Sequence, residues 1–230
     1  MKKSDFVRQI FSSVAPHYNI MNDVMSFGLH RLWKAKVVDC ITKDKGLLLD
    51  VAGGTGDIAI KILQKKNLDV TVCDISYEMI THGRNYAIDK NVLKLNWVCS
   101  NAEYLPFPNN TFDYYTIIFG IRNVSNRHRA LQEAYRVLSP KGQFICLEFS
   151  PLQNNNLFSK IYDFYSFNII PNIGKFIANN KTAYQYLVDS IRAFPSQNNF
   201  IQEIADSGFT TIYYEDICNK IATLYRASKI

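Results

Sequence analysis

The sequence predicts an α/β fold in which helices cover both faces of a mostly parallel sheet. Short apolar runs alternate with segments of helical spacing between about residues 46 and 149. Strands separated by helices in this way form βαβ units with parallel strands. The first run, Gly46–Ala52, is nearly continuous in apolar residues, as in a strand buried on both faces. Glycines at positions 53, 54 and 56 follow it, where a doubly wound sheet turns into its first helix.

The segments before this sheet are expected to be helical. Ser4–Val14 has helical spacing, with Phe6 and Ile10 on one side, and Pro16 ends the helix. Residues 17–44 form an amphipathic helical segment that is interrupted around Ser26–Gly28. We expect residues 1–44 to contribute to a helical cap over the sheet.

The central part of the chain is expected to contain five strands and the helices between them. The strands are Gly46–Ala52, Leu68–Cys73, Leu93–Cys99, Tyr114–Phe119 and Gln143–Phe149. The helices are Asp57–Lys66, Ser76–Asp89 and Arg127–Leu138. A loop with Pro106 and Pro108 takes the place of a helix after the third strand. Right-handed crossovers between parallel strands then give the doubly wound sheet.

The chain changes in character after Pro151. Leu157–Ile177 is rich in rings, but Lys160, Asp163 and Pro171 exclude a membrane-spanning helix there. Expected next are helices at Asn180–Ala193 and Ser196–Ser207, and strands at Gly208–Glu215 and Ile221–Arg226. A second core would be too small to stand alone, so we expect one domain over residues 1–230. Its parts are a cap of residues 1–44 and 151–193, a cofactor-binding core of residues 45–150, and a closing helix and strands at 194–230.

Composition excludes several classes of protein. The chain of 230 residues is 47% hydrophobic and 20% charged, which is close to the globular average and excludes disorder. Its five cysteines include no C-x-x-C pair, which indicates a reducing compartment and no zinc site. The chain has no run of 18 apolar residues and no apolar signal segment at its start. These features predict a cytoplasmic protein.

The formal net charge of +6 is compatible with nucleic acid, an anionic substrate or an anionic lipid surface as partner. The lysines are spread over helix faces, and no strand interleaves basic with aromatic residues. We therefore expect no nucleic-acid partner, and the alternative of an RNA-binding enzyme is disfavoured.

The glycine turn at Gly53–Asp57 admits three interpretations. An ordinary tight turn between strand and helix needs no ligand. Gly54–Ala59 also matches the dinucleotide pattern G-x-G-x-x-G/A, which would place a pyrophosphate at the helix N-terminus. Asp57 puts negative charge at that N-terminus, and Asp50 adds a second carboxylate at the end of the strand. Two carboxylates suit a cationic ligand without phosphate, so S-adenosylmethionine is favoured over NAD as the cofactor.

Polar residues after the second and third strands agree with this cofactor. Asp74 ends the second strand, where a carboxylate accepts hydrogen bonds from both ribose hydroxyls. The alternative for Asp74 is a helix-capping aspartate before Ser76. Asn101 and Ala102 follow the third strand, where an amide reads the adenine edge and a small residue leaves room for the ring. Asparagine is also common in loops that bind nothing.

Longer segments carry a resemblance to a known family. Tyr18–Lys34 (YNIMNDVMSFGLHRLWK) and Phe119–Val124 (FGIRNV) are its most specific motifs. Shorter matching segments are Leu49–Asp57, Asn101–Phe107, Arg136–Leu138, Glu148–Ser150 and Tyr165–Phe167. From about Phe6 to Arg226 the chain resembles the ubiquinone/menaquinone biosynthesis C-methyltransferase family, a branch of the class I S-adenosylmethionine-dependent methyltransferases.

The resemblance implies a Rossmann-like, seven-stranded class I methyltransferase sheet with an antiparallel last strand and a helical cap. It places the cofactor contacts at Thr55, Asp74, Asn101 and Ala102, and the glycine turn adds Gly53. The sequence departs from the family pattern in two places that bear on the site. Ile118 replaces a serine that the family often has before Phe-Gly, and Asp216–Cys218 replaces a usual Asn-Leu-Thr near the last strands.

The resemblance also implies methylation of a ring carbon on a polyprenylated quinol, either demethylmenaquinol or a 2-methoxy-6-polyprenyl-1,4-benzoquinol. Arg122 is the candidate partner of a quinolate oxygen, Asn123 would hold a second oxygen, and His30 is the candidate base. Each candidate has a plainer alternative. Arg122 would instead tie a loop to a carboxylate, and His30 would pack as a satisfied histidine beside Trp33. No metal is expected, because no ligand cluster is apparent.

The polyprenyl tail needs an apolar channel or a membrane surface. The aromatic stretch from Phe158 to Phe176, with the net positive charge, predicts a loose peripheral contact of the cap with the inner face of the membrane. The alternative function is a class I methyltransferase that acts on a soluble small molecule. It keeps the cofactor and loses the quinol.

Overall fold

The structure is a computed structural model that describes residues 3–14, 23, 26, 28–151 and 181–230. The ring-rich stretch at 158–176 and most of residues 15–27 lie outside the described residues. The expected cap is therefore described only in part.

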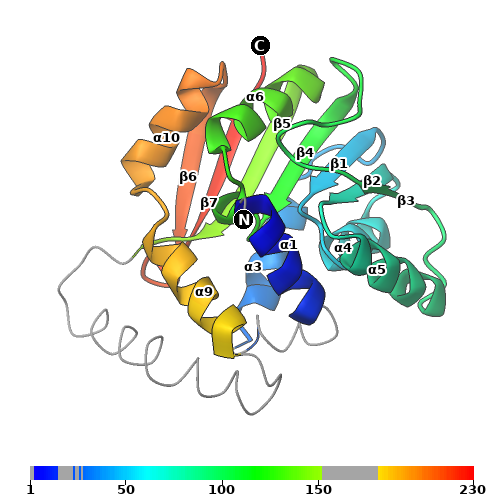
Figure 1. Ribbon diagram of the computed structural model, residues 1–230. Coiled ribbons are helices and arrows are strands. Elements are labelled where there is room, and N and C mark those ends of the chain that lie inside the picture. The colour runs from blue at the N-terminus through cyan, green and yellow to red at the C-terminus, as the bar shows by residue number, and fades with distance from the viewer. Residues whose placement is uncertain (1–2, 15–22, 24–25, 27, 152–180) are drawn as a thin grey trace.

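A seven-stranded sheet forms the centre of the molecule, in the order β3-β2-β1-β4-β5-β7-β6 (Figure 1). Its strands are β1 (Leu47–Val51), β2 (Asp69–Asp74), β3 (Leu95–Cys99), β4 (Phe112–Ile118), β5 (Leu138–Phe149), β6 (Thr210–Ile217) and β7 (Ala222–Ser228). Neighbouring strands pair in parallel except at β7, which is antiparallel to both β5 and β6. The expected sheet with one antiparallel strand is confirmed.

Helices cover both faces of this sheet. They are α1 (Lys3–Val14), α3 (His30–Asp39), α4 (Asp57–Lys65), α5 (Tyr77–Asp89), α6 (Arg127–Val137), α9 (Lys181–Arg192), α10 (Gln197–Asp206) and a short 3-10 helix, η2 (Ile121–Asn123). Ser76 caps α5 as expected, because its hydroxyl accepts the N–H of Met79 at 3.2 Å. Ser196 caps α10 in the same way through the N–H of Asn199.

Two apolar cores lie on opposite faces of the sheet, because successive residues of a strand point to opposite sides. Leu48 of β1 packs into the core that contains residues of α3, α4, α5 and α9. Leu49, the next residue, packs into the core that contains residues of α6 and α10. β1 is therefore buried on both faces, as its apolar sequence predicted.

The start of β5 differs from the expectation. The sequence predicts a turn at Ser139–Gly142 and a strand from Gln143, but β5 begins at Leu138. Phe112 pairs with Leu138 and Tyr114 with Gln143, so the residues between bulge out of the ladder with β4. Lys141 has a φ of 65° and its N–H donates to the carbonyl of Lys229 on the other side. The turn residues are thus built into the strand.

Helix α1 crosses the carboxyl end of the sheet. At its first residue the ammonium of Lys3 donates to the carbonyl of Val124, beyond η2, at 2.8 Å. Near its other end the hydroxyl of Ser12 donates to Glu78 of α5 at 2.7 Å. None of the helices in the described ranges has the length and apolar character needed to cross a bilayer.

Candidate functional site

A cavity lies at the carboxyl edge of the sheet, where β1, β2, β3 and β4 end. Its walls are the turn after β1, Asp74 and Ile75 at the end of β2, Ser100–Glu103 after β3, and both Phe119–Gly120 and Asn123–Ser125 after β4. Val7 of α1 forms part of its cover. Ligands of doubly wound folds bind at this edge, so the cavity is the candidate functional site.

The glycine turn after β1 requires its glycines for reasons of space. Gly54 has a φ of 56° and Gly56 a φ of 71°, in the left-handed region that disfavours other residues. A Cβ on Gly54 would lie 2.8 Å from the terminal methyl of Met79, and one on Gly53 would lie 2.8 Å from Oδ2 of Asp50. The N–H of Gly56 donates to the carbonyl of Gly53 at 2.9 Å. The turn is therefore tight, and of its glycines it is Gly54 that lines the cavity.

Asp74 presents its carboxylate beside this turn. Its Oδ2 accepts the N–H of Gly54 at 2.9 Å, and its Oδ1 accepts the N–H of Ser76 at 2.9 Å. Burial raises the pKa of Asp74, although the N–H donors of Ser76 and Gly54 oppose the rise. Each oxygen keeps acceptor capacity after one bond. Asp74 thus serves both as a turn and cap residue and as a lining residue with acceptors to spare.

The segment after β3 forms the opposite wall. Oδ1 of Asn101 accepts the N–H of Glu103 at 2.9 Å, which leaves the amide NH₂ of Asn101 as a donor beside the cavity. Ala102 lies between them and contributes only a methyl group. The carboxylate of Glu103 accepts the N–H groups of Ser125 and Asn126 at 3.1 and 3.2 Å. Glu103 therefore joins this wall to the wall after β4.

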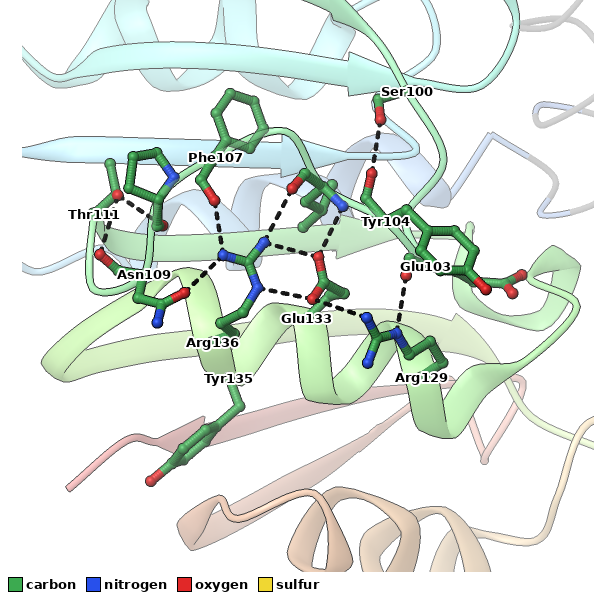
Figure 2. A network of polar contacts seen from close by, with 12 residues as sticks. Ser100, Glu103, Tyr104, Phe107, Asn109, Thr111, Arg129, Glu133, Tyr135 and Arg136 are labelled. Carbon is green, nitrogen blue, oxygen red and sulfur yellow. Dashed lines mark hydrogen bonds and ion pairs between the residues drawn. The ribbon is translucent and has the colours of Figure 1, made fainter.

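A polar network on α6 holds loop 101–111, which follows β3 (Figure 2). The guanidinium of Arg136 donates to Glu133 at 2.7 and 2.8 Å and to the carbonyls of Phe107 and Leu105 at 2.7 and 3.0 Å. Glu133 in turn accepts the N–H of Leu105 at 2.8 Å. Arg129 donates to the carbonyl of Glu103 at 3.2 Å. Loop 101–111 is thus fixed by side chains of α6 in the absence of a helix of its own.

Arg122 lies behind the wall after β4. Its Nη1 lies 2.6 Å from Glu148 and 2.6 Å from the carbonyl of Phe119, and its Nε donates to Ser190 of α9 at 3.3 Å. Only 4% of Arg122 is exposed. Burial raises the pKa of Glu148 against the opposing charge of Arg122. Of the two sequence interpretations of Arg122, the geometry matches the ion pair with a carboxylate. Arg122 is not among the residues that line the cavity.

The ion pair of Arg122 supports a strained turn at Phe119. Its φ is 57°, a backbone conformation that costs a residue other than glycine about 1–3 kcal/mol. The bond from Arg122 to its carbonyl and the stacking of its ring on Phe149, with ring centroids 4.6 Å apart, hold it there. The strained turn brings Gly120 against Ala52, where an added Cβ would lie 2.5 Å from the Cβ of Ala52. Arg122 thereby shapes the cavity from outside.

Asn123 lines the cavity and carries a notable atom. Its amide NH₂ donates weakly to the carbonyl of Phe119 at 3.5 Å, and its Oδ1 is buried with no hydrogen-bond partner in the described part of the chain. A buried acceptor without a partner is uncommon in proteins. This oxygen is therefore suited to receive a hydrogen bond from a ligand.

His30 is the first residue of α3 and is buried, with 3% of it exposed. Its Nδ1 lies 3.0 Å from the hydroxyl of Ser26 and 3.6 Å from Asp23. Burial, with the positive charge of Lys34, lowers the pKa of His30 to about 4. The imidazole is therefore neutral at neutral pH, and its contact with Ser26 is compatible with the alternative of a satisfied histidine.

The two carboxylates of the first crossover have unequal environments. Lys34 of α3 forms an ion pair of 2.6 Å with Asp57, and this charge outweighs burial and lowers the pKa of Asp57. Oδ1 of Asp50 accepts the hydroxyl of Thr116 at 2.8 Å, while its Oδ2 has no partner in the described residues. Burial raises the pKa of Asp50 to about 7. Neither carboxylate is a lining residue of the cavity.

The chain matches the model of the ubiE/COQ5 methyltransferase family over residues 1–229. It belongs to the ubiE/COQ5 methyltransferase family. Its relatives include two proteins named ubiquinone/menaquinone biosynthesis C-methyltransferase UbiE, from Rickettsia bellii and Rickettsia prowazekii. Each is 48% identical to the chain, and the matches cover 100% of this chain and 94% of the relative.

Solved structures of low sequence identity share the fold. The [4+2]-cyclase SpnF has a TM-score of 0.76 at 16% identity and covers 100% of this chain and 97% of its own. A SAM-dependent methyltransferase from Aquifex aeolicus has a TM-score of 0.64 at 15% identity, with 86% and 89% covered. This confirms the class I methyltransferase fold that the sequence predicted.

The methyltransferase uses S-adenosylmethionine, and two observations show that its cavity suits this cofactor. Asp74 offers acceptor oxygens, and the amide NH₂ of Asn101 is left as a donor beside the cavity. The sequence argument that led to the cofactor nevertheless needs a correction. It assigned the decisive negative charge to Asp57 and Asp50, but Lys34 neutralises the first and burial favours the protonated form of the second. The carboxylates beside the cavity are those of Asp74 and Glu103.

The structure of the methyltransferase brings together some of the predicted residues and separates others. Asp74, Asn101 and Ala102 line one cavity. Gly53 and Thr55 lie in the glycine turn but do not line the cavity. Their neighbour Gly54 does line it. The backbone of Thr55 instead packs against Gly83 of α5, where an added Cβ would lie 2.7 Å from it. Arg122 and His30 are also outside the lining.

Glu103 and Val7 are among the lining residues that the sequence argument missed. Glu103 follows directly after Ala102, and its place in the same loop was the available signal. Val7 of α1 had no such signal, because only the tertiary structure brings α1 across the carboxyl edge.

Proposed function

We propose that this methyltransferase transfers a methyl group from S-adenosylmethionine to a ring carbon of a polyprenylated quinol. The substrate is demethylmenaquinol, a 2-methoxy-6-polyprenyl-1,4-benzoquinol, or both. The proposal rests on the 48% whole-chain identity with relatives that are named ubiquinone/menaquinone biosynthesis C-methyltransferases. The alternative of a soluble small-molecule substrate has no such support.

We assign the cofactor contacts to the walls after β1, β2 and β3. The carboxylate of Asp74 accepts hydrogen bonds from the ribose hydroxyls, in addition to those from Gly54 and Ser76. The free NH₂ of Asn101 reads the adenine edge, and Ala102 leaves room for the ring. Gly54 allows close approach of the backbone. Gly53 and Thr55 act by fixing the turn.

Bound S-adenosylmethionine supplies an electrophilic methyl on a sulfonium, and the electron pair of the S–CH₃ bond returns to sulfur. The ring carbon of the quinol gains the methyl and then loses its proton to water. The protein aligns the reacting carbon with the methyl, and good alignment lowers the barrier by about 7–11 kcal/mol. Alignment also decides between the ring carbon and the competing quinol oxygens.

The wall after β4 orients the quinol in this proposal. Oδ1 of Asn123 accepts a hydrogen bond from a quinol hydroxyl, which gives this buried oxygen the partner it lacks among the described residues. Arg122 acts through Phe119, because its guanidinium holds the carbonyl of that strained residue. His30 has a pKa of about 4 and contributes to packing of the cap rather than to proton transfer.

We further propose a loose contact with the inner face of the membrane, where polyprenylated quinols reside. Support comes from the net charge of +6 and from the aromatic stretch at 158–176, which lies outside the described residues. Flotation with anionic liposomes at low salt should carry the protein upward. Protein that stays at the bottom of the gradient would contradict the contact.

The test of the proposed reaction is mass spectrometry of quinones from a host that lacks this activity. Expression of the chain should restore the methylated quinone, and the Asp74→Ala variant should restore much less. Accumulation of the demethylated precursor in spite of soluble, folded protein would refute the quinol substrate. The identity of the restored quinone separates the benzoquinol from the naphthoquinol substrate.

A further inference from the structure

Buried polar atoms without partners are informative, because a protein rarely leaves them unpaired. Within the described residues these atoms are Oδ2 of Asp50, Oδ1 of Asn123 and the hydroxyl of Tyr186. Asn123 lines the cavity and Asp50 lies beneath Gly53 of the glycine turn. The hydroxyl of Tyr186 belongs to the cap helix α9. Like Arg122, Tyr186 borders the wall after β4 without being one of the residues that line the cavity, and nothing in the proposed reaction uses its hydroxyl so far.

Tyr186 lies where α9 meets α1 and the wall after β4. Its ring packs edge-on against the ring of Phe6, with centroids 5.5 Å apart, and Phe6 precedes the lining residue Val7. Ser190 follows Tyr186 by four residues and therefore shares its face of the helix. The hydroxyl of Ser190 accepts Nε of Arg122 at 3.3 Å, so this face of α9 is turned toward η2.

The charged groups around Tyr186 already have partners. Arg122 of η2 and Glu148 of β5 bond to each other at 2.6 Å. Lys3 of α1 donates to the carbonyls of Arg122 and Val124 at 3.3 and 2.8 Å. Burial raises the pKa of Tyr186, with smaller and opposing effects of Arg122 and Glu148, so its hydroxyl remains protonated at neutral pH. It is therefore a buried donor whose neighbours do not take up its proton.

We infer that Tyr186 is a further substrate-binding residue, whose hydroxyl donates a hydrogen bond to an oxygen of the quinol ring. The inference rests on the proposed function. A quinol has two ring oxygens, and the more nucleophilic form of its ring carbon has one of them ionised. Asn123 provides an acceptor for the remaining hydroxyl, and Tyr186 provides a donor for the ionised oxygen.

This arrangement has a chemical consequence for the reaction. A hydrogen bond from Tyr186 stabilises the quinolate more than the neutral quinol and so lowers the pKa of the bound quinol. A larger fraction of bound substrate then has the electron-rich ring that attacks the methyl. The proton of Tyr186 stays on its own oxygen throughout, and the ring proton still leaves to water. Helix α9 thus contributes selectivity for a ring with two oxygens.

The experiment is steady-state kinetics of the full chain and Tyr186→Phe with a short-chain quinol, from pH 6 to 9. Tyr186→Phe keeps the ring that packs on Phe6 and removes only the unpaired hydroxyl. We expect kcat/KM to fall about tenfold or more, which is typical for the loss of a hydrogen bond to a charged group. The acid limb of the pH profile of kcat should move upward by about one unit. Calorimetric affinity for S-adenosylmethionine and the melting temperature should not fall.

The matched control is Tyr213→Phe, which removes the hydroxyl of an exposed tyrosine on β6. It should leave kcat/KM and the pH profile unchanged. If Tyr186→Phe changes neither the turnover nor the pH profile, the inference is overturned while the proposed function stands. A tenfold loss without any change of the pH profile would also overturn it, because a packing effect would then suffice. Absence of quinol turnover in the unsubstituted protein would overturn the proposed function itself.

Discussion

Single residues at the cavity do more than one job, and Asp74 is the clearest case. Its carboxylate accepts backbone N–H groups from the glycine turn and from the start of α5. The sequence offered a cofactor role and a capping role as alternatives, and the geometry is compatible with both at once. A carboxylate that is already oriented by two N–H donors loses little freedom when a ligand binds.

Replacement of Asp74 by alanine should weaken the binding of S-adenosylmethionine by about 1–3 kcal/mol, because the ribose hydroxyls lose their acceptors. Isothermal titration calorimetry measures this loss. Asp69→Ala is the matched control, because Asp69 is the exposed first residue of the same strand. Equal affinity of the Asp74 variant and the unsubstituted protein would remove Asp74 from the cofactor site.

Asp50 should make cofactor binding depend on pH. Its pKa is raised to about 7, so near neutral pH it is only partly ionised. A cationic ligand beside the glycine turn favours the ionised form, and binding then releases a proton. Affinity for S-adenosylmethionine should rise up to about tenfold between pH 6 and pH 8. Calorimetry in two buffers of different ionisation enthalpy measures the proton release, and Asp50→Asn should abolish it.

The same raised pKa has the opposite consequence for the stability of the protein without ligand. Between about pH 4 and pH 7 the folded protein keeps a proton on Asp50 that the unfolded chain releases. The contribution of Asp50 to the free energy of unfolding therefore falls as the pH rises through this window. An affinity for S-adenosylmethionine that does not change with pH would contradict the role of Asp50 in binding, and so would proton release that persists in Asp50→Asn.

At the scale of elements, the Arg122–Glu148 pair joins η2, β5 and α9 at one buried point. Removal of one partner leaves an uncompensated buried charge, so Arg122→Met should destabilise the fold by about 3–5 kcal/mol. Urea denaturation measures this loss.

The double variant Arg122→Met/Glu148→Leu removes both buried charges and should recover a large part of the lost stability. If the double variant is no more stable than Arg122→Met, the pair is not the source of the loss. Remaining turnover in the recovered double variant would also show how far the strained turn at Phe119 persists without its guanidinium.

Side chains of α6 bond to loop 101–111, as Figure 2 shows, and we expect the loop to depend on them for its conformation. Arg136→Lys keeps the charge but cannot reproduce the fork that reaches Glu133 and the carbonyls of Leu105 and Phe107 together. We expect faster hydrogen exchange in the loop and weaker binding of S-adenosylmethionine, because Asn101 and Ala102 lie at its start. Arg84→Lys on the exposed side of α5 is the control. Unchanged exchange in the Arg136 variant would contradict this role.

At the scale of the whole molecule, the cavity forms where four strands, η2 and α1 meet. A ligand that binds there stabilises the folded state by mass action. At a concentration of about one hundred times its dissociation constant, S-adenosylmethionine should contribute about 2.7 kcal/mol and raise the melting temperature by about 5–10 °C. Differential scanning fluorimetry measures the shift. A comparable shift with NADH would contradict the cofactor assignment.

Much of the architecture could be predicted because it depends on local patterns. The apolar run before Gly53 and the helical spacing after Gly56 fix β1 and α4 without help from the rest of the chain. The start of β5 could not be predicted, because proline and glycine near Ser139 are typical of a turn. There the turn residues bulge from the strand, and Lys141 bonds to Lys229, which lies far along the chain.

The sequence by itself determined the family, the order of strands and helices, and four of the residues that line the cavity, Asp74, Asn101, Ala102 and Asn123. These depend on motifs at strand ends, and parallel strands bring their carboxyl ends to one edge in any such sheet. Only the tertiary structure decided the state of each charge: Lys34 neutralises Asp57, Glu148 engages Arg122, and Tyr186 keeps an unpaired hydroxyl. The physical reason is that the pKa and the partner of a side chain depend on burial and on neighbours from distant segments, which no local pattern specifies.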